Sequence, residues 1–224
     1  MFFSPLIFFM MLFFVMSLVV LFFVVQIGAI SYAFDKIGVP SQYMFSLLLL
    51  SWFGSWVNIP IARLHSAEPL YEEMRVSVFG QRYVIPRRRR QHETVLAVNL
   101  GGAVIPTLLS LYLFLTRSHA PVRVLIATAA VAAVTYYLAR PVPGLGIAVP
   151  LFIPPLGAAL AALLLAPEQA PLTAYVAGSI GTLIGADVLH LNKVTGLRAP
   201  VASIGGAGTF DGVFITGIIA VLLA

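Results

Sequence analysis

The amino-acid sequence predicts an all-α fold, a polytopic transmembrane bundle of about seven helices with a small β-hairpin insertion. Three observations predict it: 60% of the 224 residues are hydrophobic, only 9% are charged, and the mean hydropathy is +1.01. Soluble domains carry roughly 25% charged residues. Because apolar runs with short connections account for nearly the whole length, we expect one membrane domain over residues 1–224.

Seven apolar segments are each long enough to cross roughly 30 Å of hydrocarbon. The first begins near Pro5 and is interpreted as a retained helix, because it lacks a basic start and is too long for the apolar core of a signal peptide. The expected spans lie at about 5–30, 43–60, 95–116, 122–139, 145–166, 172–192 and 200–223.

Glycine and proline interrupt three of these segments, in VNLGGAVIP (98–106), ARPVPGLGIAVPLFIPPLG (139–157) and ASIGGAGTF (202–210). Non-helical backbone at membrane depth is tolerated only where protein buries it or water reaches it. We therefore expect broken or kinked helices that face the interior. Ala177, Gly181 and Gly185 recur at every fourth position, which favours close helix packing.

The basic residues predict the orientation in the plasma membrane. With a cytoplasmic N-terminus, ten of the 13 Lys and Arg residues fall inside, and only Lys36, Arg117 and Arg123 fall outside. Cytoplasmic loops carry an excess of Lys and Arg, so we expect the N-terminus inside and the C-terminus outside.

The segment 61–94 is predicted to be a cytoplasmic loop that contains the hairpin. The alternation in RVSVFGQRYVI, around Phe79-Gly80-Gln81, is typical of two short antiparallel strands. The following run Arg87–Arg90 favours contact with anionic lipid, and docking of an acidic partner is the alternative.

Two carboxyl groups lie inside apolar runs. Of eight acidic residues, only Asp187, in GADVLHL, and Asp211, in GTFDGVF, are placed in this way. An ionisable group at membrane depth is costly and indicates a functional site. Both have glycine nearby, and the sequence permits a carboxyl pair without requiring one.

Other polar residues gather toward the same cytoplasmic half and suggest a polar cavity. His190 follows Asp187 by three positions and shares its helix face. The supporting residues that we expect are His190, Asn99, Asn192, Ser203 and Thr209. The glycines expected to open the backbone to water and substrate are Gly185, Gly205, Gly206, Gly208 and Gly212.

Acid–base hydrolysis is the leading functional hypothesis. Two close carboxyl groups do not ionise together easily, so one can activate water while the other protonates a leaving amine. Asp187 and Asp211 would share these catalytic roles. A proton or cation transporter, in which Asp187, His190 and Asp211 relay the charge, is an alternative. A structural or accessory role, in which each Asp caps a broken helix, is the third.

Two resemblances accompany these motifs. Thr209-Phe210-Asp211-Gly212-Val213-Phe214 resembles the aromatic-Asp motif of presenilin and signal-peptide-peptidase enzymes, and Gly185-Ala186-Asp187 is similar to the end of their Gly-x-Gly-Asp motif. This likeness implies intramembrane aspartyl protease activity. The chain after Tyr43, especially in NLGGAVIP, GADVLHL and ASIGGAGTFDGVF, also resembles a family of archaeal and bacterial membrane proteins of unknown function.

Several classes of function are disfavoured. The chain has no cysteine, and His190 has no H-x-x-x-H or H-E-x-x-H partner, so no metal site is expected. GGAGTFDG lacks the features of a phosphate loop, and no cofactor is expected. The expected partners are the lipid bilayer and either a membrane peptide or a small ion; nucleic acid is not expected, and homo-oligomerisation is left open.

Overall fold

A computed structural model describes residues 5–65, 71–78, 81–88, 93–142, 146–197, 201–206 and 212–224. Within these ranges the chain is mostly helical and contains seven α-helices and a small β-region. The α-helices are α1 (Pro5–Lys36), α2 (Ser41–Gly54), α3 (Ile105–Arg117), α4 (Pro121–Leu138), α5 (Ile153–Leu165), α6 (Ala170–Val176) and α7 (Gly212–Leu223).

Four helical stretches are long and apolar enough to cross a membrane: Phe9–Lys36, Leu100–Arg117, Pro121–Leu138 and Pro167–Val194. Two shorter apolar helices are Ile153–Leu165 and Val213–Leu223. Several apolar helices are what an integral membrane protein requires. The expectation of seven full-length helical spans is too simple, because α2, α5 and α7 have 14, 13 and 12 residues.

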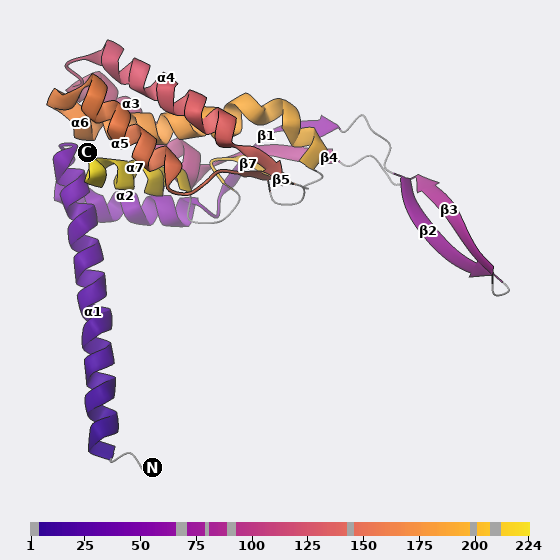
Figure 1. The fold of residues 1–224 in the computed structure, drawn as a ribbon, viewed down its shortest axis with the longest axis horizontal. Helices are drawn as coiled ribbons and strands as arrows, with labels where there is room; N and C mark the ends of the chain where they lie inside the picture. The colour runs from indigo at the N-terminus through magenta and orange to yellow at the C-terminus, as the bar shows by residue number, and fades with distance from the viewer. Residues whose placement is uncertain are drawn as a thin grey trace.

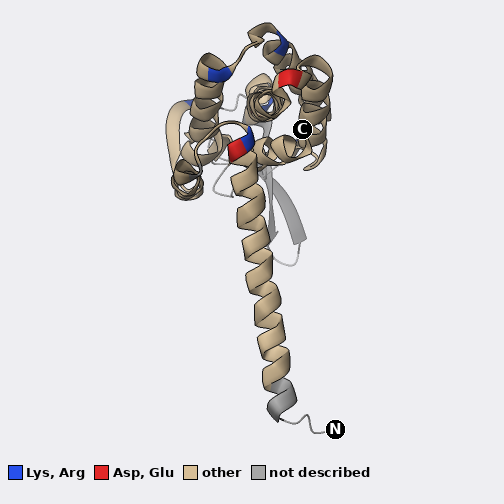
Figure 2. Ribbon diagram, turned by 90° about the vertical axis from the view of Figure 1, so that its left-hand side faces the viewer, with Lys and Arg blue, Asp and Glu red and all other residues tan. Residues whose placement is uncertain are grey.

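Helix α1 extends away from the other helices, which lie side by side (Figures 1 and 2). Its large apolar side chains from Phe9 to Val25 are exposed on all sides. Only its last turns join the core, where Ala33 and Phe34 are fully buried. A helix that is apolar all round and has no protein partner along most of its length is suited to lipid contact.

The bundle is held together by two kinds of packing. One cluster surrounds Tyr175, Phe34 and Phe214, which are large side chains with almost no exposure. The other is dominated by alanine and joins α4, α5, α6 with the helical turn that follows it, and α7; its members are Ala127, Val131, Ala158, Ala162, Ala170, Ala174, Ala177 and Ala220. Small residues let helix backbones approach closely, which is the usual basis of packing between apolar helices.

The all-α prediction is wrong in one respect, because three strands form a mixed sheet. β1 (Asn58–His65) pairs antiparallel with β4 (Glu93–Asn99), and β4 pairs parallel with β7 (Val201–Ile204). β1 therefore occupies part of the expected 43–60 span, and β4 and β7 begin the 95–116 and 200–223 spans. Apolar β-branched runs such as these cannot be distinguished from buried helix by hydrophobicity alone.

The predicted hairpin is confirmed. β2 (Tyr71–Val78) and β3 (Gln81–Arg88) pair antiparallel with Val78 opposite Gln81, and the turn between them lies outside the described residues. A further pair, β5 (Arg140–Val142) and β6 (Gly146–Ala148), falls in the Gly/Pro-rich stretch between α4 and α5.

At two of the three stretches predicted to interrupt helices, the backbone changes conformation; their depth in a membrane stays a prediction. In 98–106, the strand β4 gives way to a π-helical turn, Leu100–Val104, and then to α3. In 202–210, β7 ends at Ile204, and Gly205 and Gly206 follow with φ of 82° and 89°. Positive φ is the left-handed region that glycine adopts without the cost other residues incur.

Candidate functional site

Asp187 is the last residue of a π-helical turn, Leu183–Asp187, in the helical stretch 167–197 that we call the extended α6 segment. Its Oδ2 accepts a hydrogen bond of 2.7 Å from the backbone N–H of Gly205. The carboxyl group of Asp187 is therefore held against Gly205, the residue directly after β7.

The Gly205 position requires glycine for two reasons. Its φ is positive, and a Cβ there would lie only 2.6 Å from the backbone N of Ala103. The break after β7 thus packs directly against the π-helical turn that follows β4. This close approach holds the Gly205 N–H where Asp187 reaches it.

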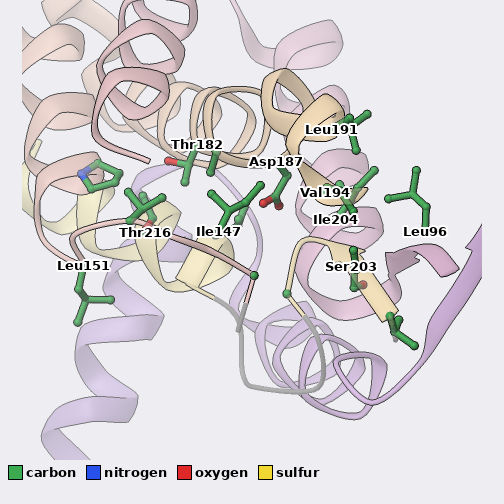
Figure 3. Close-up of a pocket in the computed structure, with 18 of the residues that line it drawn as sticks. Leu96, Ile147, Leu151, Thr182, Asp187, Leu191, Val194, Ser203, Ile204 and Thr216 are labelled. Carbon is green, nitrogen blue, oxygen red and sulfur yellow. The ribbon is translucent and has the colours of Figure 1, made fainter. Parts of the chain in front are cut away.

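A cavity of about 240 Å³ opens beside Asp187. Its walls come from the extended α6 segment, β6 and the residues after it, β4, β7 and the first turns of α7. Most of its lining is apolar; the polar side chains are those of Asp187, Thr182, Ser203 and Thr216. Figure 3 shows the Asp187 side chain among Thr182, Ile147 and Ser203. A mostly apolar cavity with a few placed polar groups is the usual form of a ligand site.

A partly buried hydrogen-bond network holds the β7 wall of this cavity. Ser203 Oγ donates to Asn58 Oδ1 at 2.6 Å, and Asn99 Nδ2 donates to the same oxygen at 3.0 Å. Asn99 Nδ2 also donates to the Ser55 carbonyl at 2.6 Å, and Asn99 Oδ1 accepts from the Gly102 N–H at 2.8 Å. Asn99 itself is fully buried and does not line the cavity, so it acts on the cavity through Asn58 and Ser203.

His190 is not part of the cavity lining, although we expected it among the residues that support the polar cavity. Its Nδ1 lies 3.0 Å from the Gly185 carbonyl, and its ring centroid lies 4.7 Å from that of Tyr136 on α4. Lys193 Nζ lies 5.7 Å from the same Tyr136 ring. Asn192 is exposed and is not part of the cavity wall. His190 therefore joins the extended α6 segment to α4.

Gly185 serves helix packing. A Cβ there would overlap the Ala132 carbonyl of α4 and lie 2.9 Å from Thr135 Cβ, and a Cβ at Gly181 would lie 2.9 Å from the Thr128 carbonyl. The predicted close packing at Gly181 and Gly185 is confirmed.

Gly208, Thr209 and Asp211 lie outside the described residues, so the predicted carboxyl pair stays a prediction. Gly206 lines the cavity, and Gly212 begins α7. Val213, the next residue of α7, also lines the cavity. Thus Gly206, five positions before Asp211, and Val213, two positions after it, line the same cavity as Asp187.

The sequence did not single out two residues of the cavity, Thr182 and Thr216. Each interrupts an apolar run, and each lies five positions from one of the two Asp residues. The five-residue spacing from an Asp could have identified these two threonines from the sequence, although hydroxyl groups are common in apolar helices. No group of three or more His, Cys, Asp or Glu residues suited to a metal ion occurs within the described ranges.

Comparison with known families gives one match: the family described as "Protein of unknown function (DUF1614)" covers residues 52–223. The chain belongs to the DUF1614 family. The DUF1614 region contains every described residue of the cavity, whereas α1 precedes it. Neither the curated proteins nor the solved structures contain a significant match.

Proposed function

We propose that this DUF1614 protein is a multi-pass protein of the plasma membrane with a cytoplasmic N-terminus and an external C-terminus. The arrangement of charge supports this. β1, β4, β5 and β7 gather at one end of the bundle, and the C-terminus lies at the other (Figure 1). Arg63, Arg140 and Lys193 belong to elements of the first end. Arg117 and the ion pair of Arg123 with Glu168, at 2.7 Å, belong to the second.

In this orientation the strand-bearing end faces the cytoplasm. The short helices α2, α5 and α7 then span only about 18–21 Å at 1.5 Å per residue. The remaining thickness would be filled by β6, β7 and Gly205-Gly206, which border the cavity or pack against its wall. This explains why glycine and proline collect at these positions.

Cysteine labelling tests the orientation, because the native chain has no cysteine. A single Gln81→Cys variant is expected to react with a membrane-impermeant maleimide only after the cells are opened, and a cysteine added after Ala224 is expected to react on intact cells. If Gln81→Cys reacts from outside intact cells, the orientation is reversed.

We further propose that the Asp187 cavity is the site of an aspartyl hydrolase that cleaves peptide bonds of membrane segments. One observation carries this proposal: Asp187 lines one cavity together with Gly206, five positions before Asp211, and Val213, two positions after it. Asp211 would supply the second carboxyl group. One carboxylate takes a proton from water, whose oxygen attacks the peptide carbonyl, and the other carboxylic acid gives its proton to the leaving amine.

Strand β7 favours an extended substrate at this site. It is an edge strand of its sheet, and its residues 201–204 line the cavity beside Asp187. An extended peptide can pair with a strand edge, which would place its backbone carbonyl groups near the carboxyl group.

The test is cleavage of a transmembrane peptide by the purified protein in detergent. Asp187→Asn and Asp211→Asn are each expected to abolish cleavage, since both members of a dyad are needed. Glu168→Gln is the matched control, because Glu168 is an exposed carboxyl group at the opposite end of the bundle. Full activity in either Asp variant would exclude the dyad.

Proton- or cation-coupled transport is the second candidate, and a specific contact favours it. Asp187 lies against a broken backbone at Gly205, and transporters commonly place ion and substrate sites beside interrupted helices. Transport requires a sealed bilayer. Solute uptake into proteoliposomes that depends on Asp187, without peptide cleavage in detergent, would favour this candidate.

A further inference from the structure

Aromatic and basic side chains meet where α4 ends and leads into β5, at the strand-bearing end of the bundle (Figure 1). Tyr136 and Tyr137 belong to the last turn of α4, and their ring centroids lie 5.6 Å apart. Arg140 begins β5, which packs against the helix 188–197 at the end of the extended α6 segment. Lys193 of that helix places its Nζ 5.7 Å from the centroid of the Tyr136 ring. The two cations therefore come from adjoining elements.

The place of this junction in the fold is that of a membrane surface. Helix α4 is long and apolar enough to cross a bilayer, so Arg140, two residues after its end, belongs at the boundary between hydrocarbon and headgroups. Tyrosine is enriched at this boundary, and the long side chains of Lys and Arg reach from it to the headgroups. Tyr137 is 83% exposed, and Val188 and Leu189, on the same helix as Lys193, are also exposed. These apolar side chains offer a surface for acyl chains.

No carboxylate of a described residue neutralises the two cations. Lys193 and Arg140 are both exposed, and within the described ranges neither forms an ion pair. Asp187, which precedes the helix of Lys193, is bound instead to the backbone after β7. At the opposite end of the bundle, by contrast, Arg123 is paired with Glu168. Two positive charges at one membrane surface are therefore available to an anion.

The helix 188–197 connects this junction to the cavity. It is a 3-10 helix, in which side chains three positions apart share a face. His190 and Lys193 both lie against Tyr136 of α4. Leu191 and Val194, on the next face, line the cavity. A ligand held by the first face would therefore hold the second face in place.

We propose that the junction formed by Tyr136, Arg140 and Lys193 binds the headgroup of an anionic phospholipid, and that the bound lipid stabilises the helix 188–197 and with it one wall of the cavity. The two unpaired cations match the negative headgroup, and the exposed apolar side chains beside them match its acyl chains, which a soluble anion lacks. The site requires only that α4 crosses a bilayer. It depends neither on the reaction at Asp187 nor on the direction in which the chain crosses the membrane.

Lipid binding by the purified full-length protein in an uncharged detergent tests the site, with bound lipid counted by native mass spectrometry. Phosphatidylglycerol supplies an anionic headgroup, and phosphatidylcholine supplies the same phosphate without net charge. The variants are Lys193→Gln and Arg140→Gln. Lys36→Gln is the matched control: Lys36 also lies over a tyrosine ring, 5.1 Å from the centroid of Tyr32, but at the opposite end of the bundle and next to Asp35.

We expect the unaltered chain to bind phosphatidylglycerol at least ~10-fold more tightly than phosphatidylcholine, because two cations distinguish the headgroups. Lys193→Gln and Arg140→Gln should each weaken phosphatidylglycerol binding about fivefold, the ratio that about 1 kcal/mol per cation gives. Lys36→Gln should bind this lipid as the unaltered chain does. Phosphatidylglycerol should also slow amide hydrogen exchange across 188–194 in the unaltered chain and have less effect in Lys193→Gln, because the bound lipid suppresses local opening of the helix.

Three results would overturn the proposal. The first is a Lys193→Gln chain that binds phosphatidylglycerol as tightly as Lys36→Gln does. The second is inorganic phosphate that binds as tightly as the lipid, which would assign the cations to a soluble anion. The third is a poly-glutamate peptide that binds more tightly than the lipid and depends on Lys193, which would assign them to an acidic protein partner. Hydrogen exchange that slows equally in Lys193→Gln would refute the link to the cavity wall.

Discussion

Replacing Asn99 with alanine tests how the cavity wall is held. The change removes three hydrogen bonds and leaves the Gly102 N–H and the Ser55 carbonyl without this partner in a fully buried place. At 1–3 kcal/mol for each orphaned group, we expect a loss of about 3 kcal/mol in the free energy of unfolding. For a chain of this size that lowers the melting temperature by about 6–12 °C.

The assay is thermal unfolding of the purified protein in one detergent, with Asn192→Ala as the control. Asn192 is exposed, so its removal is expected to change stability by less than about 0.5 kcal/mol. A melting temperature of Asn99→Ala within about 2 °C of the control would refute the argument that this network stabilises the fold.

Three further predictions follow from local geometry, each tested by the same unfolding assay. Gly185→Ala should cost about 1–3 kcal/mol because its methyl group overlaps the facing helix, whereas Gly28→Ala, with nothing within 4 Å, should be neutral or stabilising. Gly205→Ala should cost at least about 1 kcal/mol more than Gly146→Ala, because both have positive φ but only Gly205 is crowded. Arg123→Ala should cost less than about 1 kcal/mol, since its ion pair is exposed. An equal loss of stability in Gly185→Ala and Gly28→Ala, or in Gly205→Ala and Gly146→Ala, would contradict the steric argument.

Local patterns predicted those parts of the fold that depend on neighbouring residues. The hairpin was predictable because alternation in 75–85 fits strands with two different faces. The close approach at Gly181 and Gly185 was predictable from their fourfold spacing. The breaks at 98–106 and after Ile204 were predictable because glycine and proline weaken helices.

Strands β4 and β7 were not predictable from their own residues. TVLAV and VASI are as apolar as the starts of membrane helices, and their pairing depends on a partner far along the chain. The helices expected over 95–116 and 200–223 were therefore predicted too long, because each span begins with one of these strands.

Part of the candidate site was predictable from residue chemistry. A carboxyl group in an apolar run identified Asp187, and isolated amides and hydroxyls identified Asn99 and Ser203. The donor to Asp187 could not be predicted, because it is a backbone N–H and nearly every residue has one. The position of His190 depended on Tyr136 of another helix, which sequence spacing does not report.

The parallel pairing of β4 with β7 has a consequence for biosynthesis. Val95 pairs with Val201, so β4 is made and inserted long before the ribosome supplies its partner. Until then one edge of β4 is unpaired, and the cavity lacks the walls that β7 and α7 provide. Contacts this distant in sequence form late and slowly. A nascent chain released before residue 201 would thus present an open strand edge to quality-control proteases, and the site would become complete only after β7 and the first turns of α7 have been made.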